Sequence, residues 1–268
     1  METLKKKILN VLNTNSFFVK NISFLAGDAS DRKYFLAKTK KQEVIIMVDK
    51  NLDDLRQFLK ITKALEKKVS VPKIYKTFQS NGLAIIENFG KFKYSNILNS
   101  KNSKKLYKLA VENLISIQKK KFSISLPKYN INKFLDESNL FFDWYLKYCF
   151  KSSKLKKIKE ILKKELTKIY KKLYFPNNTF VHRDFHASNI MVNKNKFGLI
   201  DSQDAIIGNP LYDVASLIDD VRIKLPLNLQ NQLFNFYYIN SKYKKEKYQN
   251  LKNDFEILSV QRNLKILG

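Results

Sequence analysis

Hydrophobic residues in the first part of the chain occur mostly in short runs separated by polar turns. Runs of this kind, rich in β-branched and aromatic residues, are typical of β-strands. We expect strands over residues 17–25, 33–37, 43–48, 73–78 and 83–87. Apolar residues at helical spacing predict an amphipathic helix near the N-terminus and another over residues 53–68. The pattern therefore predicts a small lobe of five antiparallel strands with a helix.

Beyond residue 92 the spacing of apolar residues becomes helical. We expect helices over residues 104–120, 131–150 and 153–173, with Pro127 and Pro176 between them. The length of 268 residues allows one large domain or two lobes, and the change of pattern favours two. We predict a bilobal α+β protein with a larger, mostly helical second lobe.

A strand, a polar loop and a hairpin are predicted between residues 179 and 201, and the loop carries the candidate chemistry. His182, Arg183, Asp184 and Asn189 fit the kinase catalytic-loop pattern H-R-D-x-x-x-x-N. In this pattern the aspartate accepts the proton of the acceptor hydroxyl and the asparagine binds magnesium. We predict that Asp184 is catalytic and that His182 and Arg183 support the loop. The fold is then of the protein-kinase-like type, with a nucleotide-binding lobe (1–90) and a catalytic and acceptor-binding lobe (91–268).

The hairpin after the loop predicts a metal site. Pairing of its two strands would bring Asn189 and Asp201 together, and their oxygen atoms suit Mg²⁺. Ser202 follows Asp201 and no A-P-E sequence comes after it, so the activation segment of protein kinases is missing and a small-molecule kinase fits better. The role of His186 stays open: its side chain could contact the substrate or pack within the protein. Asp213, among apolar neighbours, is expected to tie the following helix to the loop.

The first lobe offers candidate contacts for ATP. Gly27, Ser30 and Arg32 lie in a predicted hairpin turn that could cover nucleotide phosphates; the alternative is a plain solvent-exposed turn. Glu87 begins the expected hinge to the second lobe, where adenine would pair with backbone groups. We expect ATP to lie between the lobes, with Mg²⁺ bridging its phosphates to the metal ligands.

Composition changes this picture little. The formal net charge is +27, but only five of the 51 basic residues are arginine and the lysines are spread along the chain, which argues against a specific nucleic-acid or membrane partner. Cys149 is alone, so no disulfide is expected. The longest aliphatic run, 44–48, is too short to cross a bilayer, which predicts a cytoplasmic location.

Several motifs resemble one known family. They are G-D-A-S-x-R-x-Y (27–34), L-F-F-D-W-Y (140–145), H-R-D-F-H-A-S-N (182–189), I-D-S-Q-D-A (200–205) and Q-R-N-L-K-I-L-G (261–268). In this order they are similar to the aminoglycoside-phosphotransferase-like superfamily, and within it to the anomeric N-acetylmuramate/N-acetylglucosamine kinases of cell-wall recycling. The resemblance implies ATP-dependent phosphorylation of the anomeric hydroxyl of these sugars, by an enzyme that we expect to be monomeric.

Two features depart from the family pattern. Ser202 stands where the family usually has phenylalanine, which loosens the apolar packing beside Asp201. Family members continue beyond the Q-R-N-L-K-I-L-G segment, whereas this chain stops within an apolar helical pattern. We therefore expect that the C-terminal end of the family is missing here, which could leave core residues exposed and impair activity.

The acceptor site is expected on the predicted helix 131–150. An aromatic plate and carboxylates suit a sugar, and Glu137, Asp143 and Trp144 supply them, with Glu137 and Trp144 about two helical turns apart and able to face one cleft. The alternative is a buried tryptophan with a surface glutamate. Two other functions stay open: a kinase for choline, ethanolamine or an aminoglycoside, and a non-catalytic kinase-like protein that binds polyanions.

Overall fold

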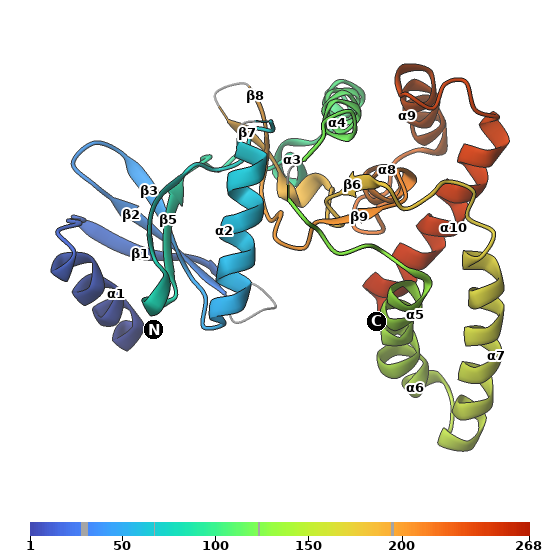
Figure 1. The fold of residues 1–268 in the computed structure, drawn as a ribbon, viewed down its shortest axis with the longest axis horizontal. Helices are drawn as coiled ribbons and strands as arrows, with labels where there is room; N and C mark the ends of the chain where they lie inside the picture. The colour runs from blue at the N-terminus through green and yellow to red at the C-terminus, as the bar shows by residue number, and fades with distance from the viewer. Residues whose placement is uncertain (28–31, 67, 123, 194–195) are drawn as a thin grey trace. The chain divides into compact units, whose positions relative to one another are not determined.

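The computed structural model describes residues 1–27, 32–66, 68–122, 124–193 and 196–268 (Figure 1). The chain folds into two compact units. The first unit consists of Met1–Phe92 and Met191–Gln203, and the second consists of Lys93–Ile190 and Asp204–Gly268. Each unit is built around its own secondary structure, and the two are considered separately.

The first unit contains the five-stranded antiparallel sheet that the sequence predicts. Its strand order is β1-β2-β3-β5-β4. The strands are β1 (Asn21–Gly27), β2 (Lys33–Lys38), β3 (Glu43–Val48), β4 (Ile74–Phe78) and β5 (Leu83–Glu87). β1 starts later than expected because Ser16 adopts a φ of 55° and the N–H of Phe17 donates to the carbonyl of Leu12, so this stretch ends the preceding helix.

Two helices cover opposite faces of this sheet (Figure 1). Helix α1 (Glu2–Thr14) buries Ile8 and Leu12 against one face, and α2 (Leu52–Glu66) buries Leu55, Phe58 and Leu59 against the other. Because both faces of the central strand β3 are covered, five of its six residues are buried. This explains why the sequence of β3 is a continuous apolar run and does not alternate between apolar and polar residues.

The turn between β4 and β5 depends on a glycine. A short 3₁₀ turn, η1 (Gln79–Asn81), leads into Gly82, which has a φ of 69° and whose carbonyl accepts the N–H of Asp49 at 2.9 Å. A Cβ atom at this position would lie 2.2 Å from the Asp49 carbonyl oxygen. No side chain fits there without moving the backbone of Asp49, which follows β3.

We expect Gly82→Ala to lower the free energy of unfolding by about 1–3 kcal/mol, since left-handed backbone and a steric clash both oppose the methyl group. Gly90→Ala is the matched control, because Gly90 has a φ of 83° but no atom within 4 Å of a built Cβ. Urea denaturation of both variants separates the clash from the backbone strain. Equal losses in the two variants would show that the contact with Asp49 contributes nothing.

A second pair of strands completes the first unit. β7 (Ile190–Asn193) pairs with β8 (Lys196–Leu199), as the hairpin pattern predicts. The N–H of Val192 donates to Phe92 and the N–H of Leu199 donates to Ser70, at 2.8 Å each. These bonds attach the hairpin, and Asp201 just after it, to the first unit.

The second unit is mainly helical. Its helices are α3 (Tyr94–Ile97), α4 (Ser103–Gln118), α5 (Ile131–Leu140), α6 (Leu146–Cys149), α7 (Ser152–Tyr170), α8 (Leu211–Ile218), α9 (Leu227–Asn240) and α10 (Tyr248–Leu267). A π-helical turn, η2 (Phe141–Tyr145), joins α5 to α6, and the short strands β6 (Thr179–Val181) and β9 (Ile206–Gly208) pair antiparallel. Helix α10 packs against α5 and α8 (Figure 1).

In the part of the chain that the structure describes, no helix combines the length and apolar character needed to span a membrane.

Candidate active site

The loop after β6 is held in an unusual backbone conformation. Arg183 has a φ of 74°, a region that costs a non-glycine residue about 1–3 kcal/mol. The carboxylate of Asp213, on α8, accepts the N–H groups of His182 at 2.7 Å and of Arg183 at 3.0 Å. Arg262, on α10, donates from Nη1 to the carbonyl of Arg183 at 3.0 Å. The strained residue is therefore fixed on both sides, and the expected tie between Asp213 and the loop is present.

The anchor of the loop is itself deeply buried. Asp213 has no exposed surface, and burial raises the pKa of its carboxyl to about 7 despite the two N–H groups that favour the charged form. Asn209 precedes α8 and accepts the N–H of Leu211, while its amide group donates to Asp254 of α10. Helices α8 and α10 thus position the loop together.

The side chain of Arg183 is bound by Glu137 of α5. Glu137 is 5% exposed, and its second oxygen accepts hydrogen bonds from the hydroxyl of Tyr129 and from Nε2 of Gln261. Burial alone would raise the pKa of Glu137, but the charges of Lys265 and Arg183 outweigh it and lower the pKa. Glu137 is therefore an ionised bracing residue that links α5, the loop and α10.

Asp184 lies at the partly exposed end of this network. Its side chain is 30% exposed, and Nζ of Lys265, on α10, lies 3.9 Å from its Oδ1. Burial opposes ionisation of Asp184, but the charges of Lys265 and Arg262 outweigh it, so its pKa lies below the usual value. The side chain of Asn189 donates to the carbonyl of Asp184 at 3.1 Å and holds the loop closed. The carboxylate of Asp184 is thus ionised at neutral pH and partly exposed.

His186 is buried beside this carboxylate rather than exposed. Its Nε2 lies 3.5 Å from Nδ2 of Asn189, and the side chain is 5% exposed. Burial and the charge of Arg222 lower the pKa of His186 to about 4. The imidazole is therefore neutral at neutral pH, and its surroundings favour packing over substrate contact.

We expect the fold to lose stability as the pH falls from about 6.5 to about 4 through His186. In this range the unfolded chain binds a proton at His186 that the folded chain does not, so acidification favours unfolding. The cost is about 1.4 kcal/mol per pH unit, or about 3 kcal/mol in total. Urea denaturation of the parent protein and His186→Gln at pH 7.5 and pH 5 measures it. If both proteins lose the same stability, His186 is not the cause.

The predicted nucleotide contacts lie in the first unit. Arg32 is 3% exposed and its guanidinium pairs with Asp49 at 2.9 Å, because a buried cation requires a counter-ion. Ser30 lies outside the described residues, and Gly27 ends β1. The N–H of Glu87 donates to the carbonyl of Lys73 at 2.8 Å. Contacts of these residues with ATP stay predictions.

Asp201, like Arg183, has a left-handed backbone conformation, with a φ of 66°. Nε2 of Gln203 donates to its Oδ1 at 2.8 Å, and the carbonyl of Gln203 accepts from Gln57 of α2 at 2.9 Å. Ser202, the residue that departs from the family pattern, is 3% exposed, so a small polar side chain occupies a buried position after Asp201. The carboxylate is thus positioned by hydrogen bonds within the first unit.

The predicted sugar-binding residues differ in burial. Trp144 is 55% exposed and lies in the π-helical turn, with Nζ of Lys147 4.3 Å from its ring centroid, whereas Glu137 is buried. The alternative interpretation, a buried tryptophan with a surface glutamate, is wrong for both residues. Asp143 pairs with Lys159 at 2.5 Å. The wider π turn changes the direction of side chains after residue 140, which a regular helical projection does not include.

Three residues of the network were not predicted from the sequence. Gln261, Arg262 and Lys265 lie on α10 and reach Glu137, Arg183 and Asp184 respectively. They belong to the Q-R-N-L-K-I-L-G segment, which the sequence marks as a motif without a role. Polar residues within an apolar helical pattern were the signal that could have identified them.

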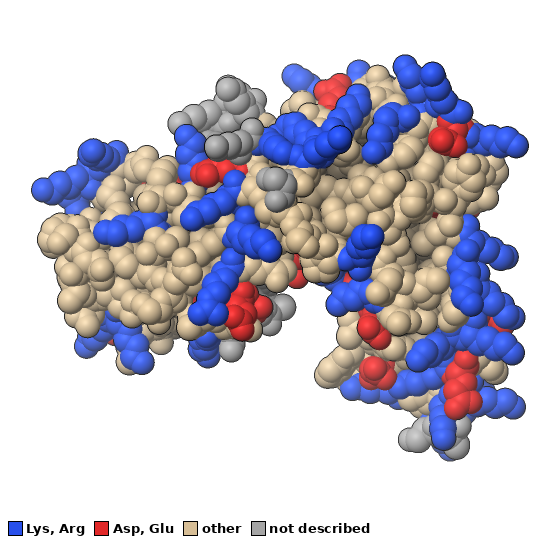
Figure 2. Space-filling view, viewed as in Figure 1, with Lys and Arg blue, Asp and Glu red and all other residues tan. Residues whose placement is uncertain are grey.

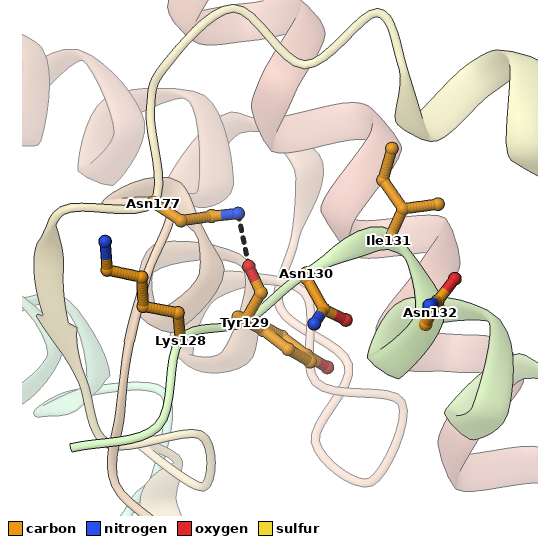
Figure 3. A pocket seen from close by; sticks show the side chains of 6 residues that line it. All are labelled: Lys128, Tyr129, Asn130, Ile131, Asn132 and Asn177. Carbon is orange, nitrogen blue, oxygen red and sulfur yellow. Dashed lines mark hydrogen bonds between the residues drawn. The ribbon is translucent and has the colours of Figure 1, made fainter.

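A separate shallow pocket of about 520 Å³ lies on the second unit (Figure 3). It is lined by Lys128, Tyr129, Asn130, Ile131, Asn132 and Asn177. The amide of Asn177 donates to the carbonyl of Tyr129, which closes one side (Figure 3). None of the loop residues 182–189 lines this pocket.

A five-stranded sheet lobe, a helical unit and a fixed H-R-D-x-x-x-x-N loop define a phosphotransferase of the protein-kinase-like class. Residues 21–247 match the model of the phosphotransferase enzyme family (APH), and the chain belongs to this family. It is an enzyme of the kinase type.

Curated relatives and solved structures agree with this assignment. The chain is 27% identical over 256 residues (91% of this chain, 74% of the relative) to the N-acetylmuramate/N-acetylglucosamine kinase of Pseudomonas aeruginosa. It is 25% identical over 258 residues (92% and 77%) to the protein of the same name from Neisseria meningitidis serogroup B. Similar folds include ADP-bound aminoglycoside phosphotransferase APH(2'')-Ib (TM-score 0.66, 17% identity, 97% and 98% coverage). Choline kinase LicA from Streptococcus pneumoniae is also similar (0.66, 15%, 98% and 91%).

Proposed function

We propose that the protein transfers the γ-phosphoryl group of ATP to the anomeric hydroxyl of N-acetylmuramate or N-acetylglucosamine. The relatives that cover most of the chain carry these sugars in their name. The observation that carries the choice of acceptor is the charge beside the catalytic carboxylate: Lys265 lies 3.9 Å from Asp184, and Arg262 also lowers its pKa.

This charge disfavours the acceptors of the structural neighbours. Aminoglycosides and choline are cations, and the attraction of a cation to Asp184 is offset by the charges of Lys265 and Arg262 beside it. N-acetylation removes the charge of an amino sugar, so N-acetylglucosamine is neutral, and N-acetylmuramate is an anion through its lactyl carboxylate. A neutral or anionic sugar therefore suits this site better than an aminoglycoside or choline.

In the proposed reaction Asp184 orients the acceptor hydroxyl and accepts its proton. The network of Glu137, Arg183 and Asp213 keeps the carboxylate in place, so that catalysis depends mainly on positioning. Trp144 is exposed and would stack on the apolar face of the sugar. Glu137 has no such role in this proposal, because its oxygens accept hydrogen bonds from the protein.

The proposal assigns magnesium to Asn189 and Asp201. An amide oxygen and a carboxylate are hard oxygen donors of the kind that Mg²⁺ prefers, and Asp201 is already oriented by Gln203. When bound, the ion would neutralise charge on the ATP phosphates. The first lobe (1–90) would supply the nucleotide contacts through Gly27, Ser30, Arg32 and Glu87, and the second (91–268) would bind the acceptor.

We further propose that the enzyme works as a cytoplasmic monomer without a nucleic-acid or membrane partner. Lysine and arginine side chains occur on both units in the view of Figure 2, interrupted by uncharged surface. Light scattering during size-exclusion chromatography tests the oligomeric state, and DNA binding at low salt tests the polyanion alternative.

Phosphorus NMR tests the proposed reaction. Protein, ATP and Mg²⁺ are incubated with N-acetylmuramate, N-acetylglucosamine, choline or kanamycin, with Asp184→Asn as the control. We expect an anomeric sugar-phosphate signal with either N-acetyl sugar, and only with the unmutated protein. A phosphorylated choline or kanamycin with no sugar phosphate would overturn the choice of acceptor.

A further inference from the structure

The ammonium group of Lys265 lacks the contacts expected of a mostly buried cation. Its side chain is 21% exposed, and burial lowers the pKa of this lysine while Asp184 and Glu137 oppose the effect. Its Nζ forms no hydrogen bond with any residue that the structure describes, and its ion pair with Asp184 spans 3.9 Å. An ammonium carries three N–H donors, so the N–H groups of Lys265 can donate hydrogen bonds to a ligand next to Asp184.

Two other cations near Asp184 are more deeply buried than Lys265. Arg183 is 13% exposed and pairs with Glu137, and Arg262 is 2% exposed and donates to the carbonyl of Arg183. Lys265 follows Gln261 by four residues on α10, so both lie on the helix face that meets Glu137 and the loop. Helix α10 thus presents one cation that can reach a ligand at Asp184.

The distance between the two groups fits a shared ligand atom. An oxygen forms hydrogen bonds of about 2.8 Å, and one atom can lie at that distance from two groups whose separation is less than about 5.6 Å. Oδ1 of Asp184 and Nζ of Lys265 are 3.9 Å apart. One acceptor oxygen can therefore donate its proton to Asp184 and accept a hydrogen bond from Lys265.

We propose that Lys265 is a second catalytic residue, which donates a hydrogen bond to the acceptor oxygen while that oxygen loses its proton to Asp184. The oxygen then forms a bond to the γ-phosphorus, the bond from that phosphorus to the β,γ-bridging oxygen breaks, and its electron pair leaves with ADP. Lys265 stabilises negative charge as it develops on the attacking oxygen. The inference rests on the proposed role of Asp184.

Lys265→Met, Lys265→Arg and Lys265→Ala test this role. We expect Lys265→Met to lower kcat by about 100-fold or more, the effect of removing one donor to a reacting oxygen. ATP affinity and melting temperature should stay close to those of the parent protein. Lys265→Arg should retain part of the activity, and added methylammonium should restore part of it to Lys265→Ala. Lys252→Met is the matched control, because Lys252 lies on the same helix and pairs with Glu256.

Three results would overturn the proposal. The first is a kcat of Lys265→Met within threefold of the parent value. The second is a raised KM for N-acetylmuramate alone with unchanged kcat, which would make Lys265 a binding residue for the sugar carboxylate. The third is lost activity with a lowered melting temperature and no rescue by methylammonium. If neither sugar is phosphorylated, the acceptor proposal fails, and the same variants are compared in ATP hydrolysis, where water supplies the oxygen.

Discussion

Asp184→Asn is expected to lower turnover by about 10²–10⁴-fold while ATP still binds. The amide keeps the size of the side chain but cannot accept the proton of the acceptor hydroxyl. It also removes the negative charge that pairs with Lys265 at 3.9 Å. Because the loop backbone is fixed by Asp213, Arg262 and Asn189, the substitution should leave the loop in place.

Steady-state phosphoryl transfer and isothermal titration with ATP measure the two parts of this expectation. Asp136→Asn is the matched control, since Asp136 is exposed on α5 and belongs to no part of the network. A variant that keeps more than a tenth of the turnover would show that Asp184 is not the proton acceptor. Loss of ATP affinity to the same degree as turnover would point to a damaged fold instead.

Glu137→Gln is expected to lower the free energy of unfolding by about 3–5 kcal/mol, because it leaves the buried charge of Arg183 without its counter-ion. Glu137 is 5% exposed and accepts hydrogen bonds from Arg183, Tyr129 and Gln261. An amide can replace only part of these contacts, since its nitrogen is a donor. The loop at Arg183 should also become less ordered, and turnover should therefore fall.

Urea denaturation of Glu137→Gln, with Asp136→Asn beside it, distinguishes two roles for this glutamate. A bracing role predicts a large loss of stability and a lower kcat. The sugar-binding role suggested by the sequence predicts unchanged stability and a raised KM for the sugar alone. The second result would refute the assignment of Glu137 to the protein network.

The local part of the architecture follows from the sequence because it depends on neighbouring residues. Strands β3 and β5 have the predicted bounds, since apolar runs ended by polar turns specify both strand and limit. The H-R-D-x-x-x-x-N spacing identifies the loop and its candidate base in the same way, because these residues act within one short segment. The end of α1 was less predictable, since it depends on the left-handed conformation of Ser16.

The contacts between distant segments were decided only by the tertiary structure. Glu137 precedes Arg183 by 46 residues and Gln261 by 124, and no local pattern distinguishes their buried cluster from a surface carboxylate. The exposure of Trp144 depends on a π turn that helical periodicity does not reveal. Sequence alone thus determined which residues the loop contains and the role that we predict for Asp184. Packing of α5, α8 and α10 decided which charges surround Asp184, because burial and electrostatic fields are properties of the assembled fold.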